Sequence, residues 1–396
     1  MTLDGMMADL RSVGRDAATG GYRRFAWTRE DACLREWFAA ECASRGLNLT
    51  VDRAGNQWAW WGDPDAAVTA GRPGVVAGSH LDSVPDGGEF DGPLGVVSAF
   101  AAVDALRAQG FVPDRPIGVV NFVDEEGARF GVACAGSRLI TGSLSAERAQ
   151  ALQDGDGVSM ASAMAAAGHD VAQLGRDAET LRRVGCFIEL HVEQGRALVD
   201  AGRPVAVGSS IWPHGRWRFD LVGEANHAGT TRLADRRDPM LDLADVITAA
   251  RRAAEQRGCV ATVGKVTVHP NGVNAIPSHV TAWLDTRGPV TGDVRAVVSD
   301  VAAAAGVSGV EESFTEDTVF DRDLATRLSS LLDGAPIFGT GAGHDAGVLS
   351  TSGVTTAMLF VRNPTGVSHS PAEHADPADC AAGAEALTAV LADLAG

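Results

Sequence analysis

The sequence predicts an α/β protein with two domains: a large domain on a mixed, mainly parallel sheet, and a small ferredoxin-like α+β domain inserted into it. The chain has 396 residues, more than one hydrophobic core usually holds. Short apolar runs that end in polar residues recur in both halves of the chain. Between them, residues 206–321 follow a β-α-β-β-α-β order. We therefore expect the large domain at residues 1–205 and 322–396.

The large domain is predicted from four apolar runs and the helices between them. Short apolar runs bounded by turns are typical of buried strands, and they cover residues 75–77, 117–123, 186–195 and 356–361. Apolar residues at helical spacing predict helices at 29–45, 94–106, 324–332 and 377–394. The other segments are expected as two strands with a Gly-Asn turn at 51–60, exposed helices at 137–185 and a glycine-rich loop at 339–346.

The inserted small domain is predicted from alternating and amphipathic segments. Residues 216–222 alternate like a half-exposed strand. A helix should begin after Asp238, which is placed to cap its N-terminus, with Pro239 in the first turn. The remaining elements are expected as strands at 259–269, 279–287 and 309–314 and a helix at 293–305.

Charge and composition exclude some classes of partner. The net charge of −18 at pH 7 disfavours nucleic acid and anionic membranes, because both attract basic surfaces. The first residues lack the basic start and apolar run of a signal peptide, and no apolar stretch is long enough to span a membrane. The six cysteines are scattered without a CxxC pair, as is typical of reduced thiols. We expect a cytoplasmic protein.

Polar groups that can bind a metal follow the first predicted strand. The carboxyl ends of strands are where open α/β sheets bind ligands. His80 can offer a neutral imidazole nitrogen, and Asp82 can accept the other ring N–H. Asp91 stands among glycines, which let the backbone approach closely. The alternative is a histidine at a strand end with ordinary turn aspartates.

Three further strand ends carry similar groups. Glu125 and Glu126 follow the second strand, and adjacent carboxylates repel each other unless cations neutralise them. The alternative is a solvated acidic turn. His191 ends the third strand, and His369 follows the fourth. A lone His191 would more often be a core histidine, but the repetition at each strand end favours a metal site.

Mixed imidazole and carboxylate donors suit two divalent ions such as zinc, manganese or cobalt. One assignment uses five groups, with Asp91 as the bridge, His80 and His191 on one ion, and Glu126 and His369 on the other. Glu125 is then left without an ion. A carboxylate in that position can act as a general base towards water.

Nine short motifs follow one another from about residue 78 to residue 374: GSHLDSV, GGEFDGPLGV, DEEGARF, ELHVEQG, GEANHAGTT, PNGVNAIP, DTR, TGAGHDA as a degraded form of SGAGHDA, and GVSHSPAE. They resemble the motifs of the dinuclear metal-dependent peptidase and amidohydrolase family, in that family's order. The likeness is to its ureido branch, which contains allantoate amidohydrolase and N-carbamoyl-L-amino-acid hydrolase. The resemblance implies the ligand assignment above, with His191 where the peptidase branch carries a carboxylate.

The resemblance also implies roles in the small domain. His227 matches a histidine that reaches the active site of a dimer partner and stabilises the oxyanion, so a homodimer through the small domain is implied. Arg287 matches the residue that holds the substrate carboxylate, a task suited to a guanidinium. Gln194 and Asn274 match contacts to the substrate's amide and carboxylate.

Three departures from the branch pattern fall near the expected substrate pocket. His214, after a proline, stands where the branch commonly has Gly-Gln, and is a further candidate for substrate binding. Ser278 replaces a usual glycine, and Arg362 begins a pair that replaces Pro-Ser. These departures bear on the choice of substrate and leave the metal chemistry intact.

The implied reaction is metal-dependent hydrolysis of the terminal carbamoyl C–N bond of a linear ureido acid, with release of ammonia and carbon dioxide. Allantoate is the leading substrate, since GEANHAGTT most resembles that member, and N-carbamoyl-L-amino acids are the alternative. Two more distant alternatives remain. A peptidase of the same fold is disfavoured by His191 and Gln194, and a non-catalytic binding protein by the complete ligand set with Glu125.

Overall fold

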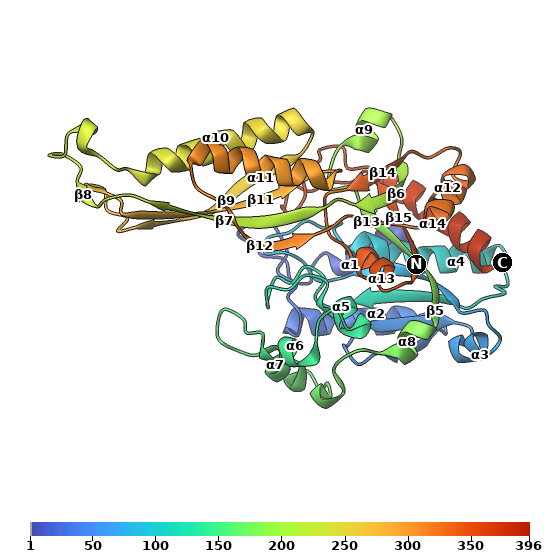
Figure 1. Cartoon of the computed structure of the whole chain (residues 1–396). Helices are drawn as coiled ribbons and strands as arrows, with labels where there is room; N and C mark the ends of the chain where they lie inside the picture. Colours follow the sequence, from blue (N-terminus) through green and yellow to red (C-terminus); the bar gives the residue numbers. More distant parts are fainter. Residues whose placement is uncertain (1) are drawn as a thin grey trace. The chain divides into compact units, whose positions relative to one another are not determined.

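The computed structural model describes residues 2–396. The chain forms two compact units, which Figure 1 shows with their elements labelled. Unit 1 contains the chain up to Ser209 together with Val319–Phe338 and Gly343–Gly396. Unit 2 contains Ser210–Thr318 and Gly339–Ala342.

A nine-stranded sheet runs through unit 1 in the order β1-β2-β4-β3-β5-β15-β6-β13, with β14 beside β6. Its strands are β1 (Asn48–Val51), β2 (Gln57–Trp61), β3 (Gly74–His80), β4 (Ile117–Phe122), β5 (Val184–Val192), β6 (Val205–Ile211), β13 (Thr318–Val319), β14 (Ile337–Thr340) and β15 (Thr355–Val361). The four central strands, β4, β3, β5 and β15, are parallel to one another. Strands β1, β2 and β6 pair antiparallel, so the sheet is mixed with a parallel centre, as the sequence predicts.

Helices pack against this sheet because the parallel strands are apolar on both faces. The helices of unit 1 are α1 (Leu3–Leu10), α2 (Arg29–Ser44), α3 (Pro64–Thr69), α4 (Pro93–Ala108), α5 (Ala135–Thr141), α6 (Ala146–Ala151), α7 (Met160–Ala166), η1 (Val171–Gln173), α8 (Ala178–Arg182), α9 (Ala197–Ala201), α12 (Arg322–Leu331), α13 (Asp345–Thr351) and α14 (Pro377–Ala395). Successive residues of a strand point to opposite faces. Val75 and Ala77 of β3 accordingly share one buried cluster with Phe100 of α4 and Leu387 of α14.

The parallel pairing decides where the polar loops lie. Strands β3, β4, β5 and β15 all run in one direction, so their carboxyl ends meet at one edge of the sheet. His80 is the last residue of β3, His191 is the last but one of β5, and Glu125 follows β4. The fold of unit 1 therefore gathers these groups, although they are far apart in the sequence.

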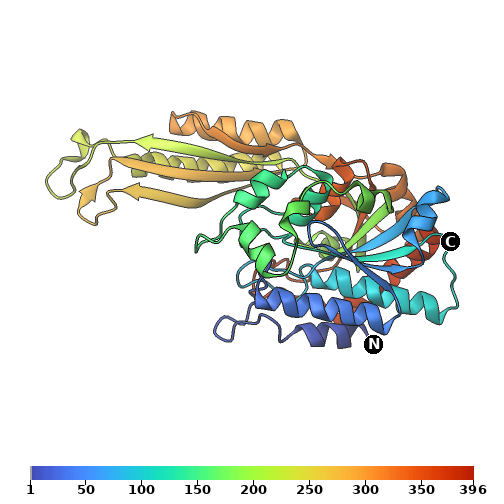
Figure 2. The same cartoon turned by 90° about the horizontal axis from the view of Figure 1, so that it is seen from below.

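Unit 2 has its own sheet and its own core. Its elements are β7 (His214–Val222), β8 (Asn226–His227), η2 (Leu233–Asp235), α10 (Pro239–Arg257), β9 (Val260–His269), β10 (Ala275–Ile276), β11 (His279–Arg287), α11 (Thr291–Ala305) and β12 (Val310–Thr315). The four-stranded sheet has the order β12-β7-β11-β9, and every pair is antiparallel. Figures 1 and 2 show α10 and α11 side by side on one face of it. Phe219 of β7, Val246 of α10 and Val297 of α11 share one buried core. Asp238 caps α10 by accepting from the Met240 N–H at 3.0 Å, as the sequence predicts.

The structure corrects three expectations about local structure. Residues 137–185 form several short helices, but the first of them, α5, is buried instead of exposed. The segment 339–346 is only partly a loop, because β14 ends within it and α13 begins within it. The sheet also contains strands β6 and β13, which the sequence does not predict. Among residues 2–396, no helix combines the length and apolar character needed to cross a membrane.

Candidate metal centre

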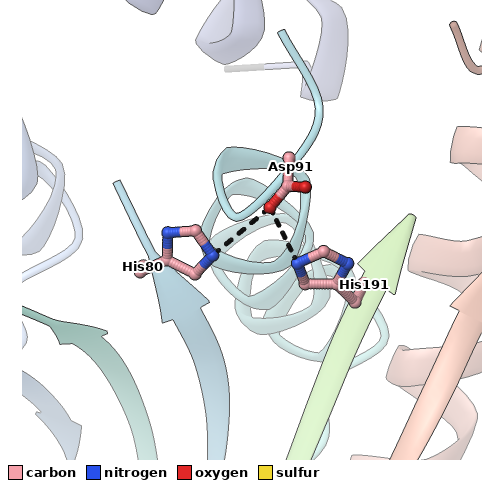
Figure 3. Close-up of side chains that lie close together, drawn as sticks. All are labelled: His80, Asp91 and His191. Carbon is pink, nitrogen blue, oxygen red and sulfur yellow. Dashed lines mark ion pairs between the residues drawn. The ribbon is translucent and has the colours of Figure 1, made fainter. Parts of the chain in front are cut away.

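Two buried histidines of unit 1 face the same carboxylate oxygen, as Figure 3 shows. His191 Nε2 lies 3.2 Å from Asp91 Oδ1, and His80 Nε2 lies 3.5 Å from it. The exposed fraction is 0% for His80 and 1% for His191. Neither Nε2 atom makes a hydrogen bond to any group in residues 2–396. Three polar groups therefore converge at close range without satisfying one another.

Main-chain carbonyls fix the tautomer of both rings. His80 Nδ1 lies 3.1 Å from the Asp82 carbonyl oxygen, and His191 Nδ1 lies 2.9 Å from the Val192 carbonyl oxygen. Because a carbonyl oxygen only accepts, each Nδ1 carries a hydrogen, and each neutral ring has its lone pair on Nε2. Two lone pairs then point at a carboxylate, which is favourable only with a cation or added protons between them. This donor set fits a divalent metal ion.

The turn that carries Asp91 packs tightly against the His80 ring. Gly92, which precedes α4, has φ of 84°, a conformation that favours glycine. A Cβ at Gly92 would clash with the imidazole of His80. Glycine is therefore needed here for both conformation and space.

A second group shares the other oxygen of Asp91. His369 Nε2 lies 3.7 Å from Asp91 Oδ2 and 3.8 Å from Glu126 Oε2. Glu126 Oε1 is buried without a hydrogen-bond partner in the described chain. The five side chains expected as ligands thus form two clusters with Asp91 in common: His80, Asp91 and His191 in one, and Asp91, Glu126 and His369 in the other.

Glu125 lies beside the first cluster. Its Oε2 is 3.7 Å from His80 Nε2, and its Oε1 is 3.4 Å from the Cys134 sulfur. The side chain is buried, so the acidic pair with Glu126 does not form a solvated turn. Burial raises the pKa of Glu125 well above its usual range, against the opposing effect of His80 and with a further contribution from Glu126.

The carboxylate of Asp82 has a different task from the expected one. The shorter contact of the His80 ring N–H is with the main-chain carbonyl of Asp82, while the carboxylate Oδ1 is 3.4 Å away. The carboxylate instead accepts from the backbone N–H of Glu125 at 3.1 Å and of Glu126 at 3.0 Å. Asp82 therefore ties the His80 loop to the acidic pair.

The crowding of charges raises the pKa values of His191 and Glu126 and lowers that of Asp91. Burial alone would lower the pKa of His191, but Asp91 outweighs it and raises the value to about 9. Burial, followed by the charge of Asp91, raises the pKa of Glu126 to about 8. The pKa of Asp91 is held well below its usual range, because His191 and His80 outweigh its burial. Without a metal, the site balances its charge by holding protons.

Gln194 lies within the cluster. Its Nε2 is 2.9 Å from Asp91 Oδ2, 3.1 Å from Ser368 Oγ and 3.2 Å from His369 Nε2. Its Oε1 is buried and has no hydrogen-bond partner among residues 2–396. The side chain is therefore close enough to the candidate ligands to contact anything bound between them.

Several buried groups around the centre are not among the residues that the sequence predicts. The ring of His344 lies 4.5 Å from that of His191, and burial followed by the charge of His191 lowers its pKa well below the usual range. Glu189 accepts from the Ser79 hydroxyl at 2.7 Å and from the Ala346 N–H at 2.9 Å. His344 and Ala346 belong to the TGAGHDA motif, whose position in the family order was the available signal.

The remaining expected residues lie in unit 2, in two places. Strand β8 pairs with β10, so exposed His227 lies opposite Ala275, directly after Asn274. At the other place, Arg287 ends β11 opposite His214, the first residue of β7. The unit thus brings the four residues together as two pairs.

The mixed sheet of unit 1 carries histidines and carboxylates at the carboxyl edge of its parallel strands, an arrangement that suits a metal-dependent hydrolase. The chain belongs to peptidase family M20/M25/M40, whose family model matches residues 76–393. An N-carbamoyl-L-amino acid amidohydrolase of Geobacillus stearothermophilus is 38% identical over 402 residues, which cover 96% of this chain and 95% of that protein. An allantoate amidohydrolase of Escherichia coli K12 is 30% identical over 403 residues, 98% of this chain and 96% of that protein.

A solved structure supports the same assignment. It is an amidase of the hydantoinase/carbamoylase family from Burkholderia multivorans, with a TM-score of 0.87 and 28% identity, covering 99% of this chain and 97% of that one. The expected family, its ureido branch and the hydrolase class are therefore confirmed.

Proposed function

We propose that this protein is a metal-dependent amidohydrolase that cleaves the terminal carbamoyl C–N bond of a linear ureido acid. The observation that carries the proposal is that Nε2 of His80 and Nε2 of His191, neither with a hydrogen-bond partner in residues 2–396, lie 3.5 and 3.2 Å from the same oxygen of Asp91. The substrate class is supported by the relatives, which are named for N-carbamoyl-L-amino acids and for allantoate.

The relatives bear on the choice between these two substrates. The sequence motifs favour allantoate, whereas the identity is 38% to the N-carbamoyl-L-amino acid enzyme and 30% to the allantoate enzyme. We place N-carbamoyl-L-amino acids first on this ground and keep allantoate as the second candidate.

The proposed cofactor is a pair of divalent ions, Zn²⁺ or Mn²⁺. The residues that would hold them are His80, Asp91 and His191 for one ion and Asp91, Glu126 and His369 for the other. When bound, such ions act as Lewis acids that polarise the carbamoyl oxygen and ease the deprotonation of water.

Glu125 is the proposed general base. Its Oε2 points towards His80, so this oxygen is placed to take a proton from the attacking water and to return it to the leaving nitrogen. Its other oxygen contacts the Cys134 thiol and is held away from the reaction.

His227 is the proposed donor to the oxyanion. Its Nδ1 accepts from the Gly229 N–H at 2.9 Å, so the neutral ring carries its hydrogen on Nε2. The Thr231 hydroxyl donates to the His227 carbonyl at 2.8 Å and holds the loop. An Nε2–H directed outwards can stabilise charge that develops on a substrate oxygen.

Arg287 is the proposed anchor for the substrate carboxylate. A guanidinium has five N–H donors. Two of them reach the Asp285 carboxylate at 2.8 and 3.2 Å, and a third reaches the Gly341 carbonyl at 2.9 Å. The donors that remain can bind a carboxylate. His214 donates from Nδ1 to the Trp212 carbonyl at 3.0 Å, which leaves an Nε2 lone pair for a substrate N–H.

Asn274 is proposed to contact the same carboxylate. Its own main-chain carbonyl accepts from the Ala228 N–H at 2.9 Å, so its loop is held against that of His227. Gln194 completes the proposed contacts to the substrate, at the carbamoyl end.

We propose unit 2 as a ferredoxin-like lid and dimerisation domain. Strand β9 has 10 residues and pairs only with β11 among the described strands, so its outer edge is open. Long open edges favour pairing with a second chain. Strand β9 and helix α10 also carry exposed apolar side chains: Val260, Val266, Met240, Leu241 and Ile247. A homodimer formed here would give His227 access to the partner.

A substrate panel tests the proposed function. Metal-loaded protein would be incubated with N-carbamoyl-L-amino acids, allantoate and dipeptides, and released ammonia and free amine would be measured. We expect ammonia from the ureido acids only. Cleavage of dipeptides without ammonia release would contradict the proposal. A cytoplasmic location, expected from the scattered cysteines, remains a prediction.

A further inference from the structure

A buried carboxylate outside the expected set contacts the turn that carries Asp91. Glu373 follows His369 on the same loop and is 6% exposed. Its Oε1 accepts from the backbone N–H of Phe90 at 2.8 Å and of Asp91 at 3.0 Å. Its Oε2 is buried and has no hydrogen-bond partner in residues 2–396. Glu373 thus belongs to the last motif of the chain but acts on the second.

The turn is shaped to receive this carboxylate. A Cβ added to Gly88 would clash with the Cβ and carboxylate of Glu373, and one added to Gly92 would clash with the His80 ring. The turn from Gly88 to Gly92 is therefore held between His80 on one side and Glu373 on the other. Glycine at both positions lets the backbone approach each group.

The orientation of this turn decides where both oxygens of Asp91 point. Oδ1 lies 3.2 Å from His191 Nε2, and Oδ2 lies 3.7 Å from His369 Nε2. Two N–H groups that donate to one oxygen fix the peptide planes around Asp91, since a hydrogen bond weakens steeply away from linearity. A rotation of the turn would move both oxygens at once.

We propose that Glu373 is a positioning residue that holds Asp91 as the shared group between the two histidine clusters. Glu373 is not among the side chains that converge as ligands in the described chain. Groups of this kind, which hydrogen-bond a ligand without touching the metal, commonly account for about 10- to 100-fold in metal affinity. The inference rests on the proposed function, because it presumes that Asp91 binds metal.

The test is a titration of the metal-free, full-length protein with Zn²⁺ in competition with a chromophoric chelator. Because Asp91 is shared, Glu373→Ala should weaken both binding events by about 10- to 100-fold. Glu373→Gln keeps a carbonyl oxygen that can accept both N–H groups, so it should restore most of the affinity. Gly88→Ala should weaken both events with Glu373 unchanged, and it supplies the answer if Glu373→Ala does not fold.

Asp177→Ala is the matched control. Asp177 is also a buried carboxylate that accepts a backbone N–H, from Thr180 at 3.0 Å, but it caps α8. This variant should lose stability and keep its Zn²⁺ affinity.

Two results would overturn the proposal. One is a folded Glu373→Ala or Gly88→Ala protein whose Zn²⁺ affinity stays within about twofold of wild type, since the loss of affinity would then be much smaller than expected. The other is a Glu373→Gln protein as weak as Glu373→Ala, because the negative charge would then matter more than the two N–H bonds. A wild-type protein that binds fewer than two ions would instead contradict the proposed function itself.

Discussion

Most candidate residues of unit 1 are buried and crowded, with His369 half exposed, whereas those of unit 2 are partly or fully exposed. His80 and His191 are almost inaccessible, and their charges and those of Asp91 depend on one another. The side chain of Arg287 is 31% exposed, and His227 lies on an open strand. Because buried charges are costly without a partner, the cluster in unit 1 favours binding of a cation. Exposure makes unit 2 suited to contact a molecule that arrives and leaves.

Removal of metal should have the largest effect. Chelation should abolish activity and lower the melting temperature, because a ligand that binds only the folded state stabilises it. Activity assays and thermal denaturation with and without chelator measure this. Undiminished activity in excess chelator, with metal shown to be absent by elemental analysis, would argue against the dinuclear site.

Glu125→Gln should lower activity by roughly a hundredfold or more, since a general base commonly contributes that much. The amide is isosteric, so metal content should stay near wild type. Elemental analysis beside the rate assay separates the two effects. Loss of both metals in this variant would mean that Glu125 is a ligand.

His227→Ala should lower activity by roughly 100- to 1,000-fold, as expected for one oxyanion donor, and should leave metal affinity unchanged. Mixing this variant with Glu125→Gln tests whether His227 acts on the active site of a dimer partner. If His227 acts across a dimer, random exchange makes half the dimers mixed, each with one intact site, and about a quarter of wild-type activity returns. If subunit exchange is demonstrated and no activity returns, His227 acts in the active site of its own chain or takes no part in the reaction.

Arg287→Lys should raise KM by roughly 10- to 100-fold, because a lysine cannot replace two charge-assisted hydrogen bonds in fixed geometry. The effect on kcat should be smaller. Arg216→Lys is the matched control, since Arg216 also contacts Asp285, at 3.5 Å. Equal KM changes in both variants would show a general effect of replacing an arginine near Asp285, and would contradict a specific role for Arg287.

Metal binding at pH 7 should release protons from His80, His191 and Glu126, whose pKa values are all raised, and this is the smallest of the expected effects. The raised pKa values of His191, about 9, and Glu126, about 8, mean that both groups hold protons in the metal-free protein at that pH. Affinity should therefore rise with pH until both have lost them. Calorimetry in buffers of different ionisation enthalpy measures the release, and a binding heat independent of buffer would contradict it.

The sequence predicts the inner part of the site better than its surroundings. His80 and His191 stand at the ends of apolar runs, so parallel pairing alone brings them to one edge. Glu373 meets the Asp91 N–H across 282 positions of sequence, and no local pattern encodes such a contact. Glu373 belongs to GVSHSPAE, the last motif of the chain. The motif indicates the family, but it does not indicate which groups the carboxylate contacts.

Secondary structure likewise divides into elements that local sequence predicts and elements that depend on tertiary contacts. Helix α10 begins where Asp238 and Pro239 predict it, because capping is local. Strand β6 was missed, since its central residues, Val207 and Gly208, form no long apolar run and gain their place by pairing with β15. Helix α5 was expected to be exposed, but its Ser137 donates to the buried Asp345 of α13, a tertiary contact.

The central claim is that Asp91 lies between two metal ions in unit 1. Anomalous diffraction from crystals grown with Zn²⁺ tests it most directly, because the signal locates each ion independently of activity. We expect two peaks, one at Oδ1 of Asp91 beside His80 and His191, and one at Oδ2 beside Glu126 and His369. A single peak, or two peaks that do not share Asp91, would contradict the account.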